Sequence, residues 1–373
     1  MNFEALDRYL DEMPSRGIPG CDLRVWQAHE PIYSRRVGVG RPGQPMAGDE
    51  TYWFYSASKV VCMAASMQLV ERGAVALDDP VSRYLPAYAH LTVRENGGVR
   101  PAKTVMTLRH LMSMQGGLNY DLNAPSVRAV REKYAPHATT RQIADALAAE
   151  PLDFDPGTHF QYSLCHDVMA AVIEAASGMT YGEYVQKNLF DPLGVKCLTF
   201  HPDEAILSRL AARYRLDEHG IAQPMENRTM GYCFSDRYES GGAGLCGDAA
   251  SYLLFADAIA NDGVGKTGAR ILRRETIDLW RTPQLTGASK ADFDALGRTG
   301  YSYALGVRVL TDPSTSRGPA GEFGWDSAAA AWVMLDPDHH LCALFTPHVL
   351  DCGRAYVEYH PAMRDLIYEG MAR

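Results

Sequence analysis

Strand-type sequence patterns concentrate near the two ends of this chain, and this distribution constrains its fold more than any other feature. The apolar runs of strand length and spacing are residues 22–28, 32–39, 301–310, 329–335 and 341–347. Between these two groups the apolar spacing is mostly helical. We therefore expect one sheet completed by both ends of the chain. The pattern predicts a mixed α/β domain, of the α+β type, formed by residues 1–75 and 290–373, with a helical domain of residues 76–289 inserted between its halves.

The composition narrows the possible partners and the cellular setting. Hydrophobic residues make up 46% and charged residues 22% of the chain, as in an ordinary soluble globular protein. The formal net charge of −9 argues against a nucleic-acid partner, because such partners are held by a basic surface. No apolar run approaches the ~20 residues of a membrane span, so no membrane partner is expected.

The N-terminal residues and the cysteines favour a cytoplasmic setting. Residues 1–8 lack the basic start and the apolar core of a signal peptide. The eight cysteines are scattered and form no Cys-x-x-Cys pair. This arrangement favours reduced and mostly buried thiols.

The segment 52–63, Tyr-Trp-Phe-Tyr-Ser-Ala-Ser-Lys-Val-Val-Cys-Met, contains the strongest candidate for a reactive centre. An aromatic run typical of a strand end meets Ser56, and helical apolar spacing begins at Ser58. Ser56 is therefore expected at a helix N-terminus, where unpaired N–H groups favour developing negative charge. Lys59 shares a helix face with Ser56, and a serine nucleophile needs such a base or cation beside it. Ser-x-x-Lys also arises by chance, and serine is a common helix cap, so the surrounding sequence decides its meaning.

The sequence after this motif resembles the family of class C β-lactamases, D-alanyl-D-alanine peptidases and related esterases. Residues 69–86 read Leu-Val-Glu-Arg-Gly-Ala-Val-Ala-Leu-Asp-Asp-Pro-Val-Ser-Arg-Tyr-Leu-Pro and match a long segment typical of that family. Similar landmarks recur up to the C-terminal strands. The resemblance implies a β-lactamase/transpeptidase-like fold, in which an antiparallel sheet is flanked by helices and an all-helical domain is inserted.

A second family-like motif supplies a tyrosine. Residues 156–164, Pro-Gly-Thr-His-Phe-Gln-Tyr-Ser-Leu, are similar to the family's Pro-Gly-x-x-Phe-x-Tyr-Ser segment. The resemblance implies that Tyr162 takes the proton of Ser56 and later activates water, with Lys59 favouring the phenolate. The alternative is that Tyr162 only packs between the domains. Leu164 departs from the family, because penicillin-recognising members carry asparagine there, and this departure argues against β-lactam hydrolysis.

The third motif of the family has two candidates in this chain. Lys266-Thr267-Gly268 spells it out, but lies between two expected helices rather than on a sheet strand, so we reject it. The segment Glu322-Phe-Gly-Trp-Asp-Ser-Ala-Ala-Ala330 resembles the Phe-Gly-Trp-Gly-Gly-Ala-Ala segment of the family's esterase branch.

By that resemblance the backbone N–H groups of Ala328 and Ser56 form an oxyanion hole. Trp325, Asp326 and Ser327 would contact the substrate, and Trp325 would remove the cation that holds a β-lactam carboxylate. Asp326 would repel anionic acyl donors if it faced the pocket. Tyr120 is a further expected contact in the substrate pocket.

Together these residues predict a serine hydrolase that forms an acyl-enzyme on Ser56, most simply a carboxylesterase acting on small esters. The same machinery would serve a β-lactamase, D-peptidase or other amide hydrolase, or an acyltransferase. A catalytically silent binding protein on the same fold is a further alternative. The expected partner is a small-molecule ester or amide. No cofactor is needed, and the twelve histidines show no metal-binding spacing.

Overall fold

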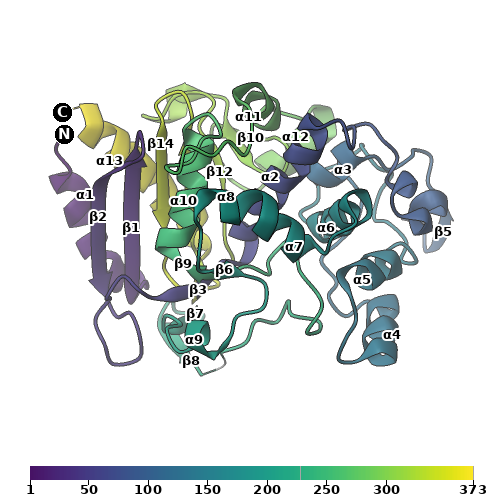
Figure 1. The fold of residues 1–373 in the computed structure, drawn as a ribbon, viewed down its shortest axis with the longest axis horizontal. Helices are drawn as coiled ribbons and strands as arrows, with labels where there is room; N and C mark the ends of the chain where they lie inside the picture. Colours follow the sequence, from purple (N-terminus) through teal and green to yellow (C-terminus); the bar gives the residue numbers. More distant parts are fainter. Residues whose placement is uncertain (227, 373) are drawn as a thin grey trace.

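A seven-stranded antiparallel sheet forms the centre of the protein in the computed structural model, which describes residues 1–226 and 228–372 (Figure 1). Its strand order is β10-β11-β12-β13-β14-β1-β2. The strands are β1 (Gly20–Gln27), β2 (Glu30–Gly38), β10 (Tyr301–Tyr303), β11 (Arg308–Leu310), β12 (Phe323–Asp326), β13 (Trp332–Asp336) and β14 (Leu341–Phe345). Strand β1 pairs with β14, with Leu23 opposite Phe345, so both ends of the chain complete one sheet as predicted.

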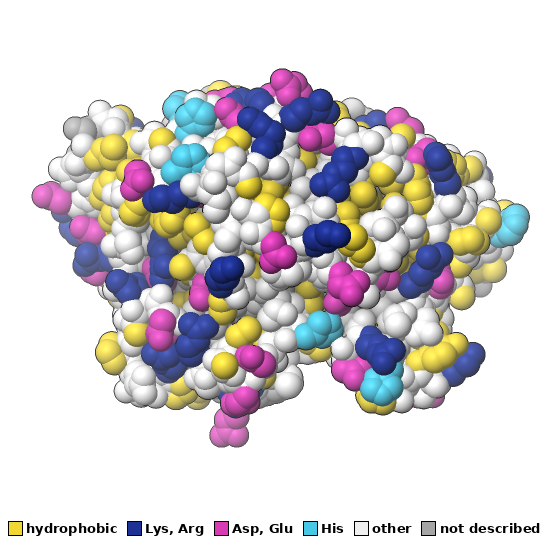
Figure 2. All heavy atoms as spheres, viewed as in Figure 1, with side chains coloured by type: hydrophobic (Ala, Val, Ile, Leu, Met, Phe, Trp, Pro, Cys, Tyr) yellow, Lys and Arg dark blue, Asp and Glu magenta, His cyan; other side chains and the backbone are white. Residues whose placement is uncertain are grey.

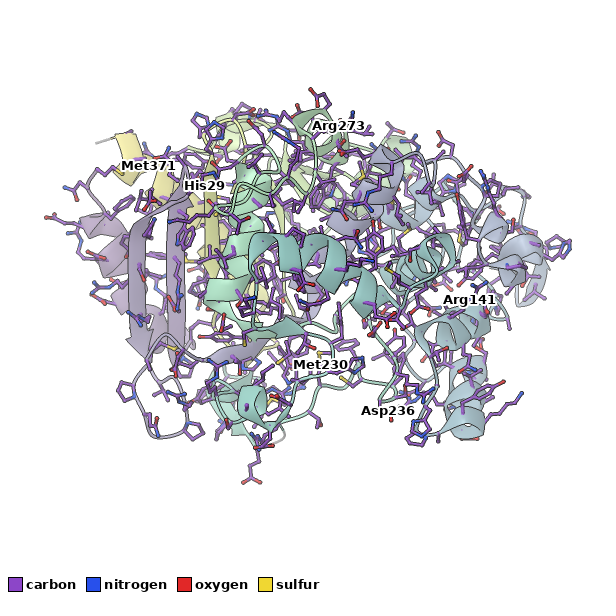
Figure 3. The ribbon with its side chains drawn as sticks, in the orientation of Figure 1. His29, Arg141, Met230, Asp236, Arg273 and Met371 are labelled. Carbon is purple, nitrogen blue, oxygen red and sulfur yellow. The ribbon has the colours of Figure 1, made fainter. Side chains whose placement is uncertain are left out.

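Two turns in this sheet differ from the sequence-based prediction. The β1–β2 turn is formed by Ala28 and His29, which have φ of 48° and 69°, rather than by the residues between the predicted runs 22–28 and 32–39 (His29 is labelled in Figure 3). Residues 301–310 form two strands instead of one, because Gly306, with φ of 80°, reverses the chain between β10 and β11. Both turns depend on left-handed backbone conformations, which apolar periodicity does not reveal.

Helices cover both faces of the sheet. The helices are α1 (Glu4–Asp11), α2 (Ser58–Glu71), α3 (Leu108–Met112), α4 (Pro125–Tyr134), α5 (Thr140–Leu147), α6 (Cys165–Ser177), α7 (Tyr181–Val185), α8 (Asp191–Leu193), α9 (Glu204–Leu207), α10 (Ala249–Ala260), α11 (Arg274–Trp280), α12 (Gly287–Asp294) and α13 (His360–Ala372). Leu10 of α1 and Ile367 of α13 share one core cluster with Val25 and Phe345 of the sheet. Helices α10 and α2 contact the sheet from the other side, and the two termini lie together at one end (Figure 1).

Helices α3 to α7 form most of a second lobe, shown at the right of Figure 1. Helix α6 is central to it, because its buried side chains contact α2, α3 and α5. The threonines at 107, 139 and 180 close capping boxes at the starts of α3, α5 and α7. These caps accompany the helical apolar spacing that the sequence shows in this region.

The insert is not all-helical, which corrects the prediction for residues 76–289. The remaining strands are β3 (Thr51–Trp53), β4 (Thr92–Glu95), β5 (Gly98–Pro101), β6 (Leu198–Thr199), β7 (Arg213–Leu216), β8 (Ala222–Met225), β9 (Cys246–Asp248) and β15 (Val349–Leu350). Strand β3 pairs with β9, and α10, which follows β9, packs on β13 and β14. These strands have two to four residues, too few for a period-two pattern to be recognised.

The surface carries both signs of charge interspersed on the face shown in Figure 2. Among the described residues, no helix combines the length and apolar character needed to cross a membrane. All eight cysteines are free thiols; Cys197 is half-buried, Cys233 is exposed and the other six are buried.

Candidate active site

Ser56 lies at the junction between β3 and α2, as the sequence indicated. One turn of 3-10 helix, Tyr55–Ala57, separates the strand from the first residue of α2, Ser58. Tyr55 has φ of 43°, a left-handed conformation that costs a non-glycine residue free energy. Its ring is buried, and its hydroxyl accepts a hydrogen bond of 2.6 Å from Arg213. Packing around Tyr55 thus holds the sharp turn that presents Ser56.

Lys59 is fully buried and lies between Ser56 and the second lobe. Its Nζ donates to the carbonyl oxygen of Gly242 at 2.7 Å, and lies 3.3 Å from the Tyr120 hydroxyl and 3.4 Å from Ser56 Oγ. Burial lowers the pKa of Lys59 to about 8, although the nearby Asp167 carboxylate opposes the shift. A lysine with a pKa of about 8 is neutral in about one molecule in ten at pH 7, and in that form it can accept a proton.

Tyr162 joins this pair from the segment before α6. The Lys59 Nζ lies 4.5 Å from the centre of its ring, and the Trp325 indole N–H donates to its hydroxyl at 3.1 Å. Burial raises the pKa of Tyr162 well above the ordinary value, and hydrogen bonds with Ser56 and Trp325 only partly oppose this. The phenolate is therefore not favoured in the resting site, contrary to the expectation from its proximity to lysine. The ammonium faces the ring rather than the hydroxyl.

The segment after β12 closes the site from the sheet side. Ser327 and Ala328 line the cavity together with Ser56 and Trp325. The pairing of β12 with β13 ends at Asp326, and within residues 1–226 and 228–372 the backbone N–H of Ala328 donates to no backbone acceptor. The oxyanion hole formed by the N–H groups of Ala328 and Ser56 stays a prediction.

Asp326 lines the cavity, but its carboxylate is paired with cations of the protein. Its carboxylate forms ion pairs with Arg298 and with Arg308, the latter at 3.2 Å, and lies 3.3 Å from His360. Although burial alone would raise its pKa, the two arginines hold the pKa of Asp326 well below the usual range. Its charge is therefore balanced inside the protein, and the expected repulsion of anionic acyl donors does not follow.

Of the other residues considered in the sequence analysis, only Tyr120 lines the cavity. The Tyr120 ring stacks on that of Tyr162, with centroids 5.7 Å apart, and lines the cavity. Leu164 is buried at the start of α6. Lys266 contacts the His29 carbonyl and Glu30 at the β1–β2 turn, away from Ser56, so the rejected Lys-Thr-Gly tripeptide is not part of the site.

The site contains one cavity of about 440 Å³. Of the predicted residues, it is lined by Ser56, Tyr120, Tyr162 and residues 325–328, whereas Lys59 is buried behind it. Tyr232, Arg298 and Tyr356 also line it and were missed by the sequence analysis. None belongs to a recognisable motif, and each reaches the cavity from a different part of the chain. A second cavity, of about 610 Å³, lies between α7 and Phe200 and contains none of the predicted site residues. Among the described residues, no cluster of His, Cys, Asp or Glu could hold a metal ion.

The central antiparallel sheet, the helical lobe and the position of Ser-x-x-Lys between them define a β-lactamase/transpeptidase-like fold. A solved structure described as EstCE1, a hydrolase with promiscuous acyltransferase activity, superposes with a TM-score of 0.77 at 23% identity, and the match covers 97% of each chain. The chain belongs to the Beta-lactamase family, whose model matches residues 6–349.

Curated relatives cover most of the chain as well. Esterase EstB of Burkholderia gladioli is 29% identical over 86% of this chain and 83% of its own length. Lovastatin esterase of Penicillium rubens is 28% identical over 77% of this chain and 73% of its own length.

Proposed function

We propose that this protein is a serine hydrolase that forms an acyl-enzyme on Ser56 and acts as a carboxylesterase. The observation that carries the proposal is that Ser56 and Tyr162 line one cavity and the buried Lys59 contacts both of them, although Tyr162 is more than a hundred positions away in the chain. The esterase names of two relatives support the same reaction class. Trp325 in place of a cationic residue, and Leu164 in place of asparagine, favour esters over β-lactams.

The proposed reaction begins with Lys59 in its neutral form. Its Nζ accepts the Ser56 hydroxyl proton as Ser56 Oγ bonds to the ester carbonyl carbon, and the 3.4 Å separation is expected to shorten when substrate is bound. The N–H groups of Ser56 and Ala328 stabilise the oxyanion. When the bond to the leaving alcohol breaks, Tyr162 donates its hydroxyl proton to that oxygen. The first proton then passes from Lys59 to the Tyr162 phenolate through solvent, because the Lys59 Nζ faces the Tyr162 ring rather than its oxygen.

Deacylation repeats these steps with water as the nucleophile. Water gives a proton to Lys59 as its oxygen bonds to the acyl carbon, and Ser56 leaves as the alcohol with a proton from Tyr162. An alcohol in place of water would give acyl transfer, which the description of EstCE1 makes a specific second candidate. Product analysis with a competing alcohol separates the two outcomes.

A fluorophosphonate probe tests the nucleophile directly. We expect the probe to label the protein once, with the adduct on the peptide containing Ser56 by mass spectrometry, because the probe reacts only with an activated hydroxyl. A protein that only binds ligands on this fold would remain unlabelled. Labelling of a different serine, or none, would contradict the proposal. Nitrocefin turnover matching ester turnover would instead indicate a β-lactamase.

The pKa of Lys59 predicts a pH profile. Because the neutral amine is the active form, kcat/KM should rise about tenfold per pH unit below pH 8 and become constant above it. The measurement is kcat/KM for p-nitrophenyl acetate, corrected for spontaneous hydrolysis, across this range. If kcat/KM showed no transition near pH 8, Lys59 would not be the proton acceptor.

Asp167→Asn provides the matched control for this profile. The buried Asp167 carboxylate accepts hydrogen bonds from Tyr238 and Ser240, and its charge raises the pKa of Lys59. The amide can keep those acceptor contacts but carries no charge. The transition in kcat/KM should therefore move to lower pH in this variant, whereas a different titrating group would leave it in place.

A further inference from the structure

The part of the cavity beyond the reacting groups is mostly apolar. Tyr120, Tyr232 and Tyr356 contribute aromatic surface beside Trp325. The Tyr232 ring meets that of Tyr120 edge to face, with centroids 5.9 Å apart, so these walls are packed against one another. The cavity volume of about 440 Å³ is within the range that holds drug-sized ligands, and an acetyl ester would leave most of it to water.

Exposed apolar side chains line the same cavity. Large hydrophobic side chains in the described residues are mainly buried, but Leu296 is 46% and Val357 is 53% exposed, and both are lining residues. Leu296 follows α12, and Val357 lies in the π-helical turn Ala355–Tyr359 before α13. The two segments adjoin, since a Cβ at Gly297 would lie 3.6 Å from Val357. Water contact at both side chains costs free energy that an apolar ligand would recover.

The two charged residues that line the cavity, Arg298 and Asp326, do not alter the apolar character of this wall. The Arg298 guanidinium lies between Trp325, at 4.9 Å from the ring centre, and Tyr356, at 5.3 Å. It forms an ion pair with Asp326, and its side chain is only 12% exposed. Arg298 therefore braces the two rings, and its charge is matched by a buried carboxylate.

We infer that the substrate is an ester with a bulky apolar group that reaches from Ser56 to Leu296 and Val357. This inference rests on the proposed function and specifies its substrate class. It replaces the small esters expected from the sequence with esters of medium-length or branched apolar groups. The apolar group is held by the aromatic walls, and its end covers the two exposed aliphatic side chains.

Two substrate series test this inference. The first compares p-nitrophenyl hexanoate with the acetate, which varies the acyl part, and the second compares hexyl acetate with ethyl acetate, which varies the alcohol part. Each buried methylene contributes about fourfold, so four methylenes should raise kcat/KM at least about tenfold in one series. A gain in either series supports the inference and identifies the side that enters the cavity. If kcat/KM does not rise with chain length in either series, the inference is overturned.

Variants at the two exposed positions locate the effect. The double variant Leu296→Ser, Val357→Ser is measured in the series that shows the gain. Its ratio of kcat/KM for the long ester to that for the short ester should fall at least about threefold. The matched controls are Leu279→Ser and Val105→Ser, since these side chains are 39% and 65% exposed and do not line the cavity. These controls should leave the ratio unchanged. A ratio that is the same in the Leu296 and Val357 variant as in the wild type contradicts the inference.

A binding measurement separates this inference from the proposed reaction. Calorimetry with the Ser56→Ala protein should show at least about tenfold tighter binding of the long ester than of its short counterpart, because turnover in this variant is too slow to consume the ester during the titration. If the wild type hydrolyses acetate through Ser56 but shows neither chain-length preference nor tighter binding, the inference fails and the proposed function stands. If no ester is hydrolysed but the long ester still binds more tightly, the proposed function fails and the apolar site stands.

Discussion

Ser56→Ala is expected to lower kcat for p-nitrophenyl ester hydrolysis by about four to six orders of magnitude, the range found when a nucleophile that acts as a unit with its base is removed. The reason is that the remaining groups can still bind and polarise the ester but cannot form the acyl-enzyme. Residual turnover would come from direct attack of water on the ester, with the oxyanion stabilised by the N–H groups of the predicted oxyanion hole. The measurement is steady-state turnover of the acetate and the hexanoate at about pH 8, where Lys59 is half neutral.

Ser66→Ala is the control for this variant. Ser66 is buried on the same helix, α2, and its hydroxyl donates to the Cys62 carbonyl at 2.8 Å, away from the cavity. Its removal should leave kcat within about twofold of the wild type. If Ser56→Ala retained a tenth of the wild-type rate while Ser66→Ala behaved normally, Ser56 would not be the nucleophile.

Arg308→Met is expected to lower the free energy of unfolding by about 3–5 kcal/mol, as is typical when one partner of a buried ion pair is removed. Arg308 on β11 is 3% exposed and contacts Asp326 at 3.2 Å, Glu322 at 3.4 Å and the Val333 carbonyl at 3.0 Å. Methionine preserves much of the side-chain volume but leaves two buried carboxylates with fewer cationic partners. The loss should appear as a lower midpoint of urea unfolding, followed by tryptophan fluorescence.

The comparison variant is Arg215→Met. Arg215 pairs with Asp351, but the two side chains are 55% and 58% exposed, and exposed pairs contribute about 0–1 kcal/mol. Its urea midpoint should stay close to that of the wild type. Equal midpoints for the Arg308 and Arg215 variants would show that the buried network beneath Trp325 does not stabilise the fold.

The residues expected to control ester hydrolysis adjoin those expected to control stability. Asp326 pairs with both Arg298 and Arg308, and Arg298 stacks on Trp325, whose N–H donates to Tyr162. Asp326, which stands where the family's Phe-Gly-Trp-Gly segment has its second glycine, thus holds Arg298 in the wall of the cavity. Trp325 is therefore connected through Arg298 to the ion pairs of Asp326.

The sequence alone determined the local elements and the chemical groups. Helical spacing after Ser58 placed Ser56 and Lys59 on adjacent turns, and the strand patterns at both ends predicted the sheet that β1 and β14 complete. These features are visible in the sequence because they depend on neighbours within a few residues or on apolar periodicity. The threonine caps of α3 and α5 are local signals of the same kind.

Only the tertiary structure decided how these groups behave. Burial lowers the pKa of Lys59 and raises that of Tyr162, so the lysine rather than the phenol is the better resting base. Arg298 and Arg308 neutralise Asp326, and Tyr232 and Tyr356 enter the cavity from separate segments. A pKa depends on every charge and dipole within several ångströms and on the exclusion of water, and these are set by residues distant in the chain. The sequence therefore supplied the reacting groups, whereas the fold set their protonation and the shape of the space around them.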